Sequence, residues 1–329
     1  MKRRTFIAGL GSAAAWPLAA GAQQSAMPVV GYLGITAPGA GGIGRNQAAL
    51  LKGLADTGFV DGRNVAIEYR WVAGQEEKLP VILRELIERR VAVLASPGST
   101  AISLAAKAAT QTIPIVFRVG GDPVAMGLVS SLNMPCGNVT GTTTLGVTLG
   151  AKRLQMLREL LPTGATVALF SNPRNANAAA EAREIDAAAK VLDVRLLVLN
   201  ATSPSELDVA FERIAQENVS GVLNAADPFI ISQRDRIVAL AARRAIPGVY
   251  LALTFLDIGG LIFYGSSSAI EEFYTVGTYI GRILKGEKPG DLPVQQSTKV
   301  ELAINLKTAK AAGITIPTAL LVRADKVIE

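Results

Sequence analysis

Residues 91–118, VAVLASPGSTAISLAAKAATQTIPIVFR, form the stretch that decides the fold. Its two ends, 91–96 and 113–118, are short apolar runs rich in β-branched residues, which is typical of strands buried on both faces of a parallel sheet. Segment 100–110 between them is rich in alanine and has the periodicity of a helix. A strand, a helix and a second strand in this order predict one unit of an α/β fold.

The same alternation of strand and helix patterns continues on both sides of this unit. The expected strands are 29–35, 65–71, 91–96, 113–118, 166–171, 194–200, 221–224, 248–251 and 261–264. The expected helices are 45–57, 76–90, 100–110, 123–132, 150–161, 177–192, 204–218, 230–244 and 270–285. The start at residue 204 is well marked, because Ser203 offers an N-cap, Pro204 suits the first turn and Glu206 stands at the third position.

Residues 137–144, GNVTGTTT, interrupt the alternation with an extended stretch that has no helical period. The alternation restarts after them. We therefore predict an α/β protein made of two doubly wound parallel sheets, one before and one after this crossover. Ligands of open α/β sheets bind at the carboxyl ends of the strands, so two such lobes predict a binding cleft between them.

The composition excludes several classes of function. The formal net charge of +6 falls to +3 when residues 1–22 are left out, because they carry three basic and no acidic side chains. No dense cluster of Lys and Arg with interleaved aromatics follows, so we expect no nucleic-acid partner. Histidine is absent, which excludes Ser-His-Asp and Cys-His catalysis and histidine-ligated metals. We expect no enzyme activity, metal or cofactor.

The single cysteine, Cys136, lies in the turn-like stretch 133–138. It has no second cysteine with which to form an internal disulfide, and no histidine to activate it as a nucleophile. We expect it to be a bystander thiol.

The first 22 residues have the pattern of a cleaved signal peptide. A basic start is followed by an apolar run over 6–20 and by Ala20-Gly21-Ala22, an A-x-A cleavage site before Gln23. Arg3 and Arg4 also give the start a twin-arginine form. The sequence predicts export to the periplasm, and no later run of apolar residues is long enough to span a membrane.

Several stretches, in order along the chain, resemble one family. They are DGRNVAIEYRW (61–71), IPIVF (113–117), GDPV (121–124), GNVTG (137–141), ILKG (283–286), DLPVQ (291–295) and INLKTAK (304–310). Together they resemble the ABC-type substrate-binding proteins of the tryptophan/tyrosine-transport type, over essentially the whole mature chain.

The resemblance implies a type I periplasmic-binding fold whose lobes are joined by three crossovers. The N-terminal lobe would contain 28–140 and 258–295, and the C-terminal lobe 141–257 and 296–329. It further implies a monomer that delivers a small carboxylate-bearing ligand to a membrane ABC permease, the ligand being an amino acid, aromatic ones included, or a related compound. The loop that starts at Thr36 would contact the ligand, although 36–44 is richer in glycine than the family pattern.

The same loop offers an alternative interpretation, because Gly39, Gly41 and Gly44 match G-x-G-x-x-G between a strand and a helix. With Glu68 on the next strand, this pattern predicts an exported NAD(P)-dependent oxidoreductase. Two features weigh against it. Gly39 comes four residues after the expected end of the strand, and Glu68 falls in the middle of the next strand rather than at its end.

In the first lobe, polar residues follow two expected strands. Ser96, Ser99 and Thr100 lie between a strand and a helix, where hydroxyls and free helix N–H groups suit a carboxylate. A simple N-cap by Ser99 is the alternative. Gly121 comes after the fourth strand, where a glycine lets the backbone approach the cleft.

In the second lobe, Asn172 and Asp227 follow strands and are expected to face the cleft from the opposite side. Asp227 would pair with a ligand ammonium, unless it only caps the helix that starts at Pro228. Tyr250 and Tyr264 stand in or after late strands and are candidates for the walls of the pocket, with ordinary packing as the alternative.

Overall fold

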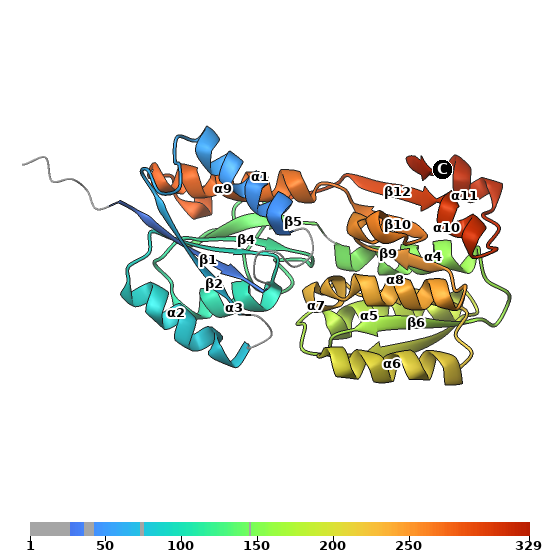
Figure 1. The fold of residues 1–329 in the computed structure, drawn as a ribbon. Coiled ribbons are helices and arrows are strands. Elements are labelled where there is room, and N and C mark those ends of the chain that lie inside the picture. Colours follow the sequence, from blue (N-terminus) through green and yellow to red (C-terminus); the bar gives the residue numbers. More distant parts are fainter. Residues whose placement is uncertain (1–26, 36–42, 73–75, 145) are drawn as a thin grey trace, which may run out of the picture.

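A computed structural model describes residues 27–35, 43–72, 76–144 and 146–329. It contains two α/β lobes that lie side by side, each with a central sheet covered by helices (Figure 1). The predicted signal peptide, Thr36, Gly39 and Gly41 lie outside the described residues. The predicted fold class, two lobes built on parallel sheets, is confirmed.

The first lobe has a six-stranded, all-parallel sheet with the order β11-β5-β4-β3-β1-β2. Its strands are β1 (Val29–Gly34), β2 (Ala66–Trp71), β3 (Val93–Pro97), β4 (Ile115–Val119), β5 (Val139–Thr143) and β11 (Gln295–Gln296). Each strand places alternate side chains on opposite faces, so the sheet has two apolar cores. One core packs against α2 (Leu79–Glu88) and α3 (Thr100–Ala109), and the other against α1 (Ile43–Asp56) and α9 (Ala269–Leu284).

Helix α9 belongs to the first lobe although it lies near the end of the chain. Its backbone touches that of α1 because glycines face each other there. A Cβ on Gly53 would lie 2.0 Å from the carbonyl oxygen of Tyr274, and one on Gly277 would lie 2.0 Å from that of Leu50. No other residue fits at either position without moving one of the helices.

The second lobe has a seven-stranded sheet with the order β13-β12-β10-β9-β8-β6-β7, in which only the β10–β12 pair is antiparallel among the described strands. Its strands are β6 (Thr166–Ser171), β7 (Arg195–Asn200), β8 (Gly221–Asn224), β9 (Gly248–Tyr250), β10 (Ile262–Ser266), β12 (Val300–Asn305) and β13 (Lys326–Ile328). One face packs against α4 (Gly150–Arg158), α5 (Ala178–Val191), α10 (Leu306–Ala311) and α11 (Thr318–Val322). The other packs against α6 (Pro204–Gln216), α7 (Pro228–Ser232) and α8 (Arg234–Arg243).

The chain crosses between the sheets three times, after β5, after β10 and after β11. The first crossover leads into the 3-10 turn η2 (Gly146–Leu149). The crossovers lie side by side: the Ser297 amide donates to the Thr143 carbonyl at 2.9 Å, and the Ser266 and Ser297 hydroxyls are 3.1 Å apart. The three connections therefore form one hinge between the lobes.

All three expected boundaries between the lobes are wrong. Strand β10 was expected in the first lobe, within 258–295, but it pairs with β9 and β12 in the second sheet. The boundary at 140/141 cuts through β5, which continues to Thr143 beside β4, and the boundary at 295/296 divides the two residues of β11, which pairs with β5. In each case a strand runs to the hinge before the chain crosses, so the crossover comes later than the sequence suggested.

One expected helix, 123–132, is absent, and the residues form turns instead. Asp122 Oδ1 accepts hydrogen bonds from the Val124 and Ala125 amides and so caps a turn. Gly127 then adopts a φ of +72°, in the left-handed region, which ends any helical path. The predicted cap at Ser203 is confirmed, because its hydroxyl accepts from the Glu206 amide at 3.3 Å.

Candidate ligand-binding site

A cleft lies between the lobes, where helix and strand ends of both sheets meet. The described residues enclose a cavity of about 60 Å³ in it. Its lining comes from both lobes and includes Gly98, Ser99, Thr100 and Gly120 on one side and Asn172, Arg174, Asn175, Asn177 and Asp227 on the other. This is the edge at which ligands of open α/β sheets bind.

On the first-lobe side, the N-terminus of α3 points into the cleft. Ser99 is the N-cap, and its hydroxyl accepts a hydrogen bond from the Ile102 amide at 3.2 Å. The first backbone hydrogen bond within the helix runs from the Ser103 amide to the Ser99 carbonyl, so the amides of Thr100 and Ala101 precede it. The capping role of Ser99 and a position in the cleft thus occur together, as both interpretations of the sequence allowed.

A direct hydrogen bond joins the two lobes in the cleft. Asn177 is the N-cap residue of α5 but does not cap it with its side chain. Its Nδ2 instead donates to Thr100 Oγ1 at 3.2 Å, and both side chains are buried. Gly121 lies against the same amide, because a Cβ there would be 2.8 Å from Asn177 Oδ1. Gly121 therefore permits the lobes to approach.

On the second-lobe side, Asp227 is the centre of a buried polar cluster. One carboxylate oxygen, Oδ1, accepts from the Ile230 amide at 2.9 Å and caps α7, while Oδ2 accepts from the side chains of Asn175 at 2.9 Å and Asn172 at 3.2 Å. Burial raises the pKa of Asp227 above its usual value, and these hydrogen bonds oppose the shift. Asp227 is thus both a cap and a cleft residue, and a carboxylate retains further acceptor positions.

Two of the predicted site residues belong to the interior of a lobe. Ser96 is fully buried, with its hydroxyl 2.9 Å from that of Ser103 on α3. Tyr250 is 1% exposed and stacks on Phe255 with ring centroids 4.5 Å apart. Their placement in the cleft is corrected, because alternation along each strand turns these side chains into a core. Tyr264 is partly buried against the core under α4 and α5, so its role as a wall of the pocket stays a prediction.

Three polar side chains of the cleft, which follow Asn172 closely, were not predicted from the sequence. Arg174, Asn175 and Asn177 all line the cavity. The signal was present in the asparagine-rich loop NPRNAN at 172–177, directly after a buried strand. Only its first residue was selected.

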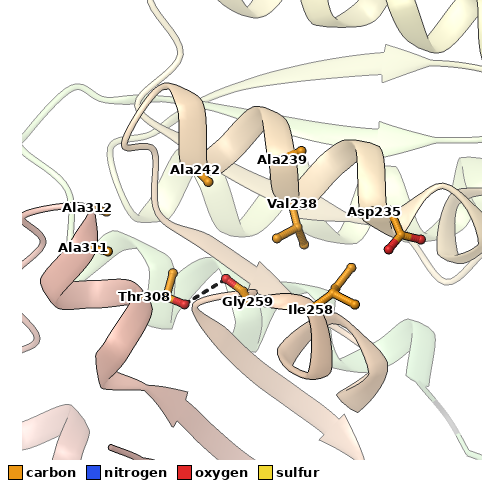
Figure 2. A pocket seen from close by; sticks show the side chains of 9 residues that line it. All are labelled: Asp235, Val238, Ala239, Ala242, Ile258, Gly259, Thr308, Ala311 and Ala312. Atoms are coloured by element: carbon orange, nitrogen blue, oxygen red, sulfur yellow. Dashed lines mark hydrogen bonds between the residues drawn. The ribbon is translucent and has the colours of Figure 1, made fainter.

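A second hollow, of about 350 Å³, lies within the second lobe between α8, the 3-10 turn η3 (Leu253–Ile258) and α10 (Figure 2). Its lining is mostly small and apolar, and Figure 2 shows one hydrogen bond there, from Thr308 Oγ1 to the Gly259 carbonyl. It is larger than the cleft, but it touches a single lobe and has few polar groups to orient a ligand. The cleft is the better candidate.

The alternative dinucleotide site receives no support. Gly44, the last glycine of the pattern, lies in the first turn of α1. Glu68 is in the middle of β2 and forms ion pairs with Arg70 at 3.1 Å and Arg89 at 2.8 Å. Its carboxylate is therefore already engaged by two arginines.

Among the residues that the structure describes, no helix is long and apolar enough to cross a membrane. The same residues contain no group of three His, Cys, Asp or Glu side chains that could hold a metal ion. The thiol of Cys136 is exposed and not in a disulfide.

Two α/β lobes, three crossovers and a polar cleft define the class of type I periplasmic-binding folds. A crystal structure of a conserved domain protein from Vibrio cholerae superposes with a TM-score of 0.81 at 27% identity, covering 92% of this chain and 99% of that one. An ABC domain from Streptococcus pneumoniae, solved in complex with L-Trp, gives 0.79 at 23% identity over the same shares. These comparisons confirm the fold.

The family follows from the sequence comparisons. The model of the ABC transporter substrate binding protein family matches residues 39–328, and the chain belongs to that family. A tyrosine-binding protein of Clostridioides difficile is 26% identical over 267 residues, which cover 80% of this chain and 75% of the relative. The predicted resemblance to ABC-type substrate-binding proteins is confirmed, and the family is one of transport proteins rather than oxidoreductases.

Proposed function

We propose that this chain is the exported, non-catalytic component of an ABC importer that captures a small carboxylate-bearing ligand between its lobes and delivers it to a membrane permease. The ligand is an amino acid, aromatic ones included, or a related small acid. One observation carries the proposal: the N-terminus of α3 faces the Asp227 cluster across a single cleft. An anion-binding end and a buried carboxylate on opposite lobes suit the two charges of an amino acid.

The size of the cavity supports capture by closure. A space of about 60 Å³ holds a few water molecules, whereas pockets that enclose a ligand measure roughly 300–1,000 Å³. An amino acid therefore enters only when the lobes separate, and its contacts with both sides then favour the return to a closed state. The relatives named as binding tyrosine or L-Trp agree with a ligand of this class.

Export and stoichiometry belong to the same proposal. The pattern of residues 1–22 supports a twin-arginine signal peptide and a periplasmic mature protein that starts at Gln23. We propose that this mature chain acts as a monomer, because each lobe supplies its half of the cleft from the same chain.

Calorimetry with matched pairs of compounds tests the proposed ligand class. L-Tyrosine and L-tryptophan are compared with tyramine and tryptamine, which lack the carboxylate, and L-leucine and L-glutamate extend the panel. We expect at least one amino acid to bind and its decarboxylated partner to fail. Equal binding of acid and amine would contradict carboxylate recognition, and a co-purified dinucleotide seen by native mass spectrometry would contradict the transport role.

A further inference from the structure

A buried ion pair lies behind the cleft in the second lobe. Arg153 on α4 and Glu181 on α5 are each 1% exposed, and Arg153 Nη2 donates to Glu181 Oε1 at 3.1 Å. The pair forms because α4 and α5 are close at Gly150, where a Cβ would lie 2.7 Å from the Ile185 side chain. Neither side chain lines the cleft cavity.

The pair connects the hinge to the cleft. Arg153 Nη1 donates to the carbonyl of Gly146, the first residue of η2 at the first crossover, at 3.3 Å. On the other side, Glu181 Oε2 accepts from the Ala226 amide at 2.9 Å. Ala226 precedes Asp227 in the chain, and its carbonyl accepts from Asn175 Nδ2 at 3.1 Å. Glu181 and Asn175 thus hold both backbone polar groups of Ala226, the residue that precedes Asp227.

An ion pair in this position is not explained by stability alone. Taking two charges out of water costs several kcal/mol per ion, and well-packed apolar side chains are often at least as stabilising. Apolar residues here would leave the Ala226 amide and the Gly146 carbonyl without these partners. The charged pair fixes the positions of two backbone groups, the Gly146 carbonyl at the hinge and the Ala226 amide beside the cleft.

We propose that Arg153 and Glu181 are positioning residues for ligand binding, which hold the 225–227 loop in its binding conformation and tie it to the first crossover of the hinge. This inference rests on the proposed function, since it treats the loop as one wall of a ligand cleft. Movement of the crossover during closure is passed to Asp227 through the guanidinium and the carboxylate.

The charge on Glu181 gives the proposal a distinct signature. Burial raises the pKa of Glu181 to about 7, while Arg153 and the Ala226 amide oppose the shift. The other charged or titratable groups that act on the pair are Asp227 from the loop, Glu184 from α5 itself and Tyr264 from β10. Below pH 7 the carboxyl gains a proton and the contact with Arg153 weakens. Ligand affinity should therefore rise with pH through about 7.

Hydrogen exchange on the mature protein tests the proposal without any ligand. The double substitution Arg153→Leu and Glu181→Leu removes both charges together and so leaves no unpaired ion. We expect the amides of residues 225–227 to exchange at least tenfold faster, while β6 and β8 keep their protection. Asp186→Asn is the matched control, because it removes a carboxylate of the same helix that pairs with the exposed Lys190, and it should leave the loop unchanged.

Glu181→Gln serves as a second variant in case the double substitution does not fold. Arg153 and the Ala226 amide donate to different oxygens of Glu181, and glutamine replaces one of these oxygens with an NH2 group that only donates. One of the two contacts therefore becomes a donor facing a donor. It should speed exchange of the loop, and for the amino acid that binds best in the panel it should flatten the pH profile of the affinity. Exchange of the 225–227 amides at the parent rate in the folded variant would overturn the proposal. A panel without any binder would instead refute the proposed ligand class and leave the exchange result to stand alone.

Discussion

The contact between Gly121 and Asn177 allows a sharp test of lobe closure. Gly121→Ala adds one methyl group in the first lobe, 2.8 Å from Asn177 Oδ1 and 3.2 Å from Asn177 Cγ in the second. Overpacking of this kind costs about 1–3 kcal/mol. Because the overlap exists only when the lobes are together, the cost falls on the closed state. We expect ligand affinity to drop by about 5- to 140-fold.

A second substitution, at Asn177, distinguishes a steric overlap between the lobes from a general loss of affinity. Asn177→Ala removes the overlap and also the hydrogen bond to Thr100, whose net value is about 0.5–1.5 kcal/mol, or about 2- to 12-fold in affinity. The double variant Gly121→Ala/Asn177→Ala should therefore lose no more than this, and it should bind at least as well as Gly121→Ala alone. A second substitution that improves the first is not expected from two independent losses.

Calorimetry measures the affinities, with the best-binding amino acid of the panel as the probe. Small-angle scattering measures the radius of gyration with and without that ligand, and Gly121→Ala should shrink less than the parent on binding. Circular dichroism checks that each variant is folded. Parent-like affinity and closure of Gly121→Ala would refute a steric overlap in the closed state. A lower affinity of the double variant than of Gly121→Ala alone would refute it as well.

Other substitutions separate the cleft residues from those that the structure assigns to the core. Asp227→Ala should weaken binding by about 2–5 kcal/mol in calorimetry, because a buried charge loses its partner, and should cost about 1 kcal/mol of stability as a lost cap; parent-like affinity would show that Asp227 is only a cap. Ser96→Ala should leave ligand affinity unchanged, and it should lower the free energy of unfolding measured in urea by about 0.5–1.5 kcal/mol because it removes one hydrogen bond inside the first lobe. A clear loss of affinity would show that Ser96 contributes to the ligand site. Replacing Arg3 and Arg4 with Lys should stop export, and intact mass of a periplasmic extract of the parent should give a chain that starts at Gln23; recovery of full-length protein from the cytoplasm alone would contradict a cleaved signal peptide.

The sequence predicted strands best where burial on both faces makes the pattern continuous. Of the nine predicted strands, β6 and β8 begin and end at the predicted residues, and the other seven lie within two residues of the prediction at each end. Strand β5 falls in the stretch predicted as an extended crossover, and β11, β12 and β13 were not predicted. The lobe of β10 was not predictable in this way, because its antiparallel partner β12 lies far along the chain, with Ile262 opposite Ile304. Local pattern carries no information about such a pairing.

The candidate site was predicted only in part, for a similar reason. Position after a strand located Ser99, Thr100, Asn172 and Asp227 at the cleft. It failed for Ser96 and Tyr250 because one residue along a strand decides between a core and an open edge, and neighbouring strands set that choice. Asn177 was missed because the direction of its side chain depends on the path of a loop and on a contact with the opposite lobe.

The pairing of α1 with α9 also limits when the first lobe can finish folding. Gly53 and Gly277 bring the two helices together, so the α1 face of the first lobe is covered only after most of the chain is present. Contacts between such distant residues slow folding, and the apolar surface stays open to other molecules in the meantime. A fragment that ends before residue 269 would keep five of the six strands of the first sheet yet expose the face that α9 covers. The first lobe is therefore not a unit that can be cut from the chain at residue 269 and studied on its own.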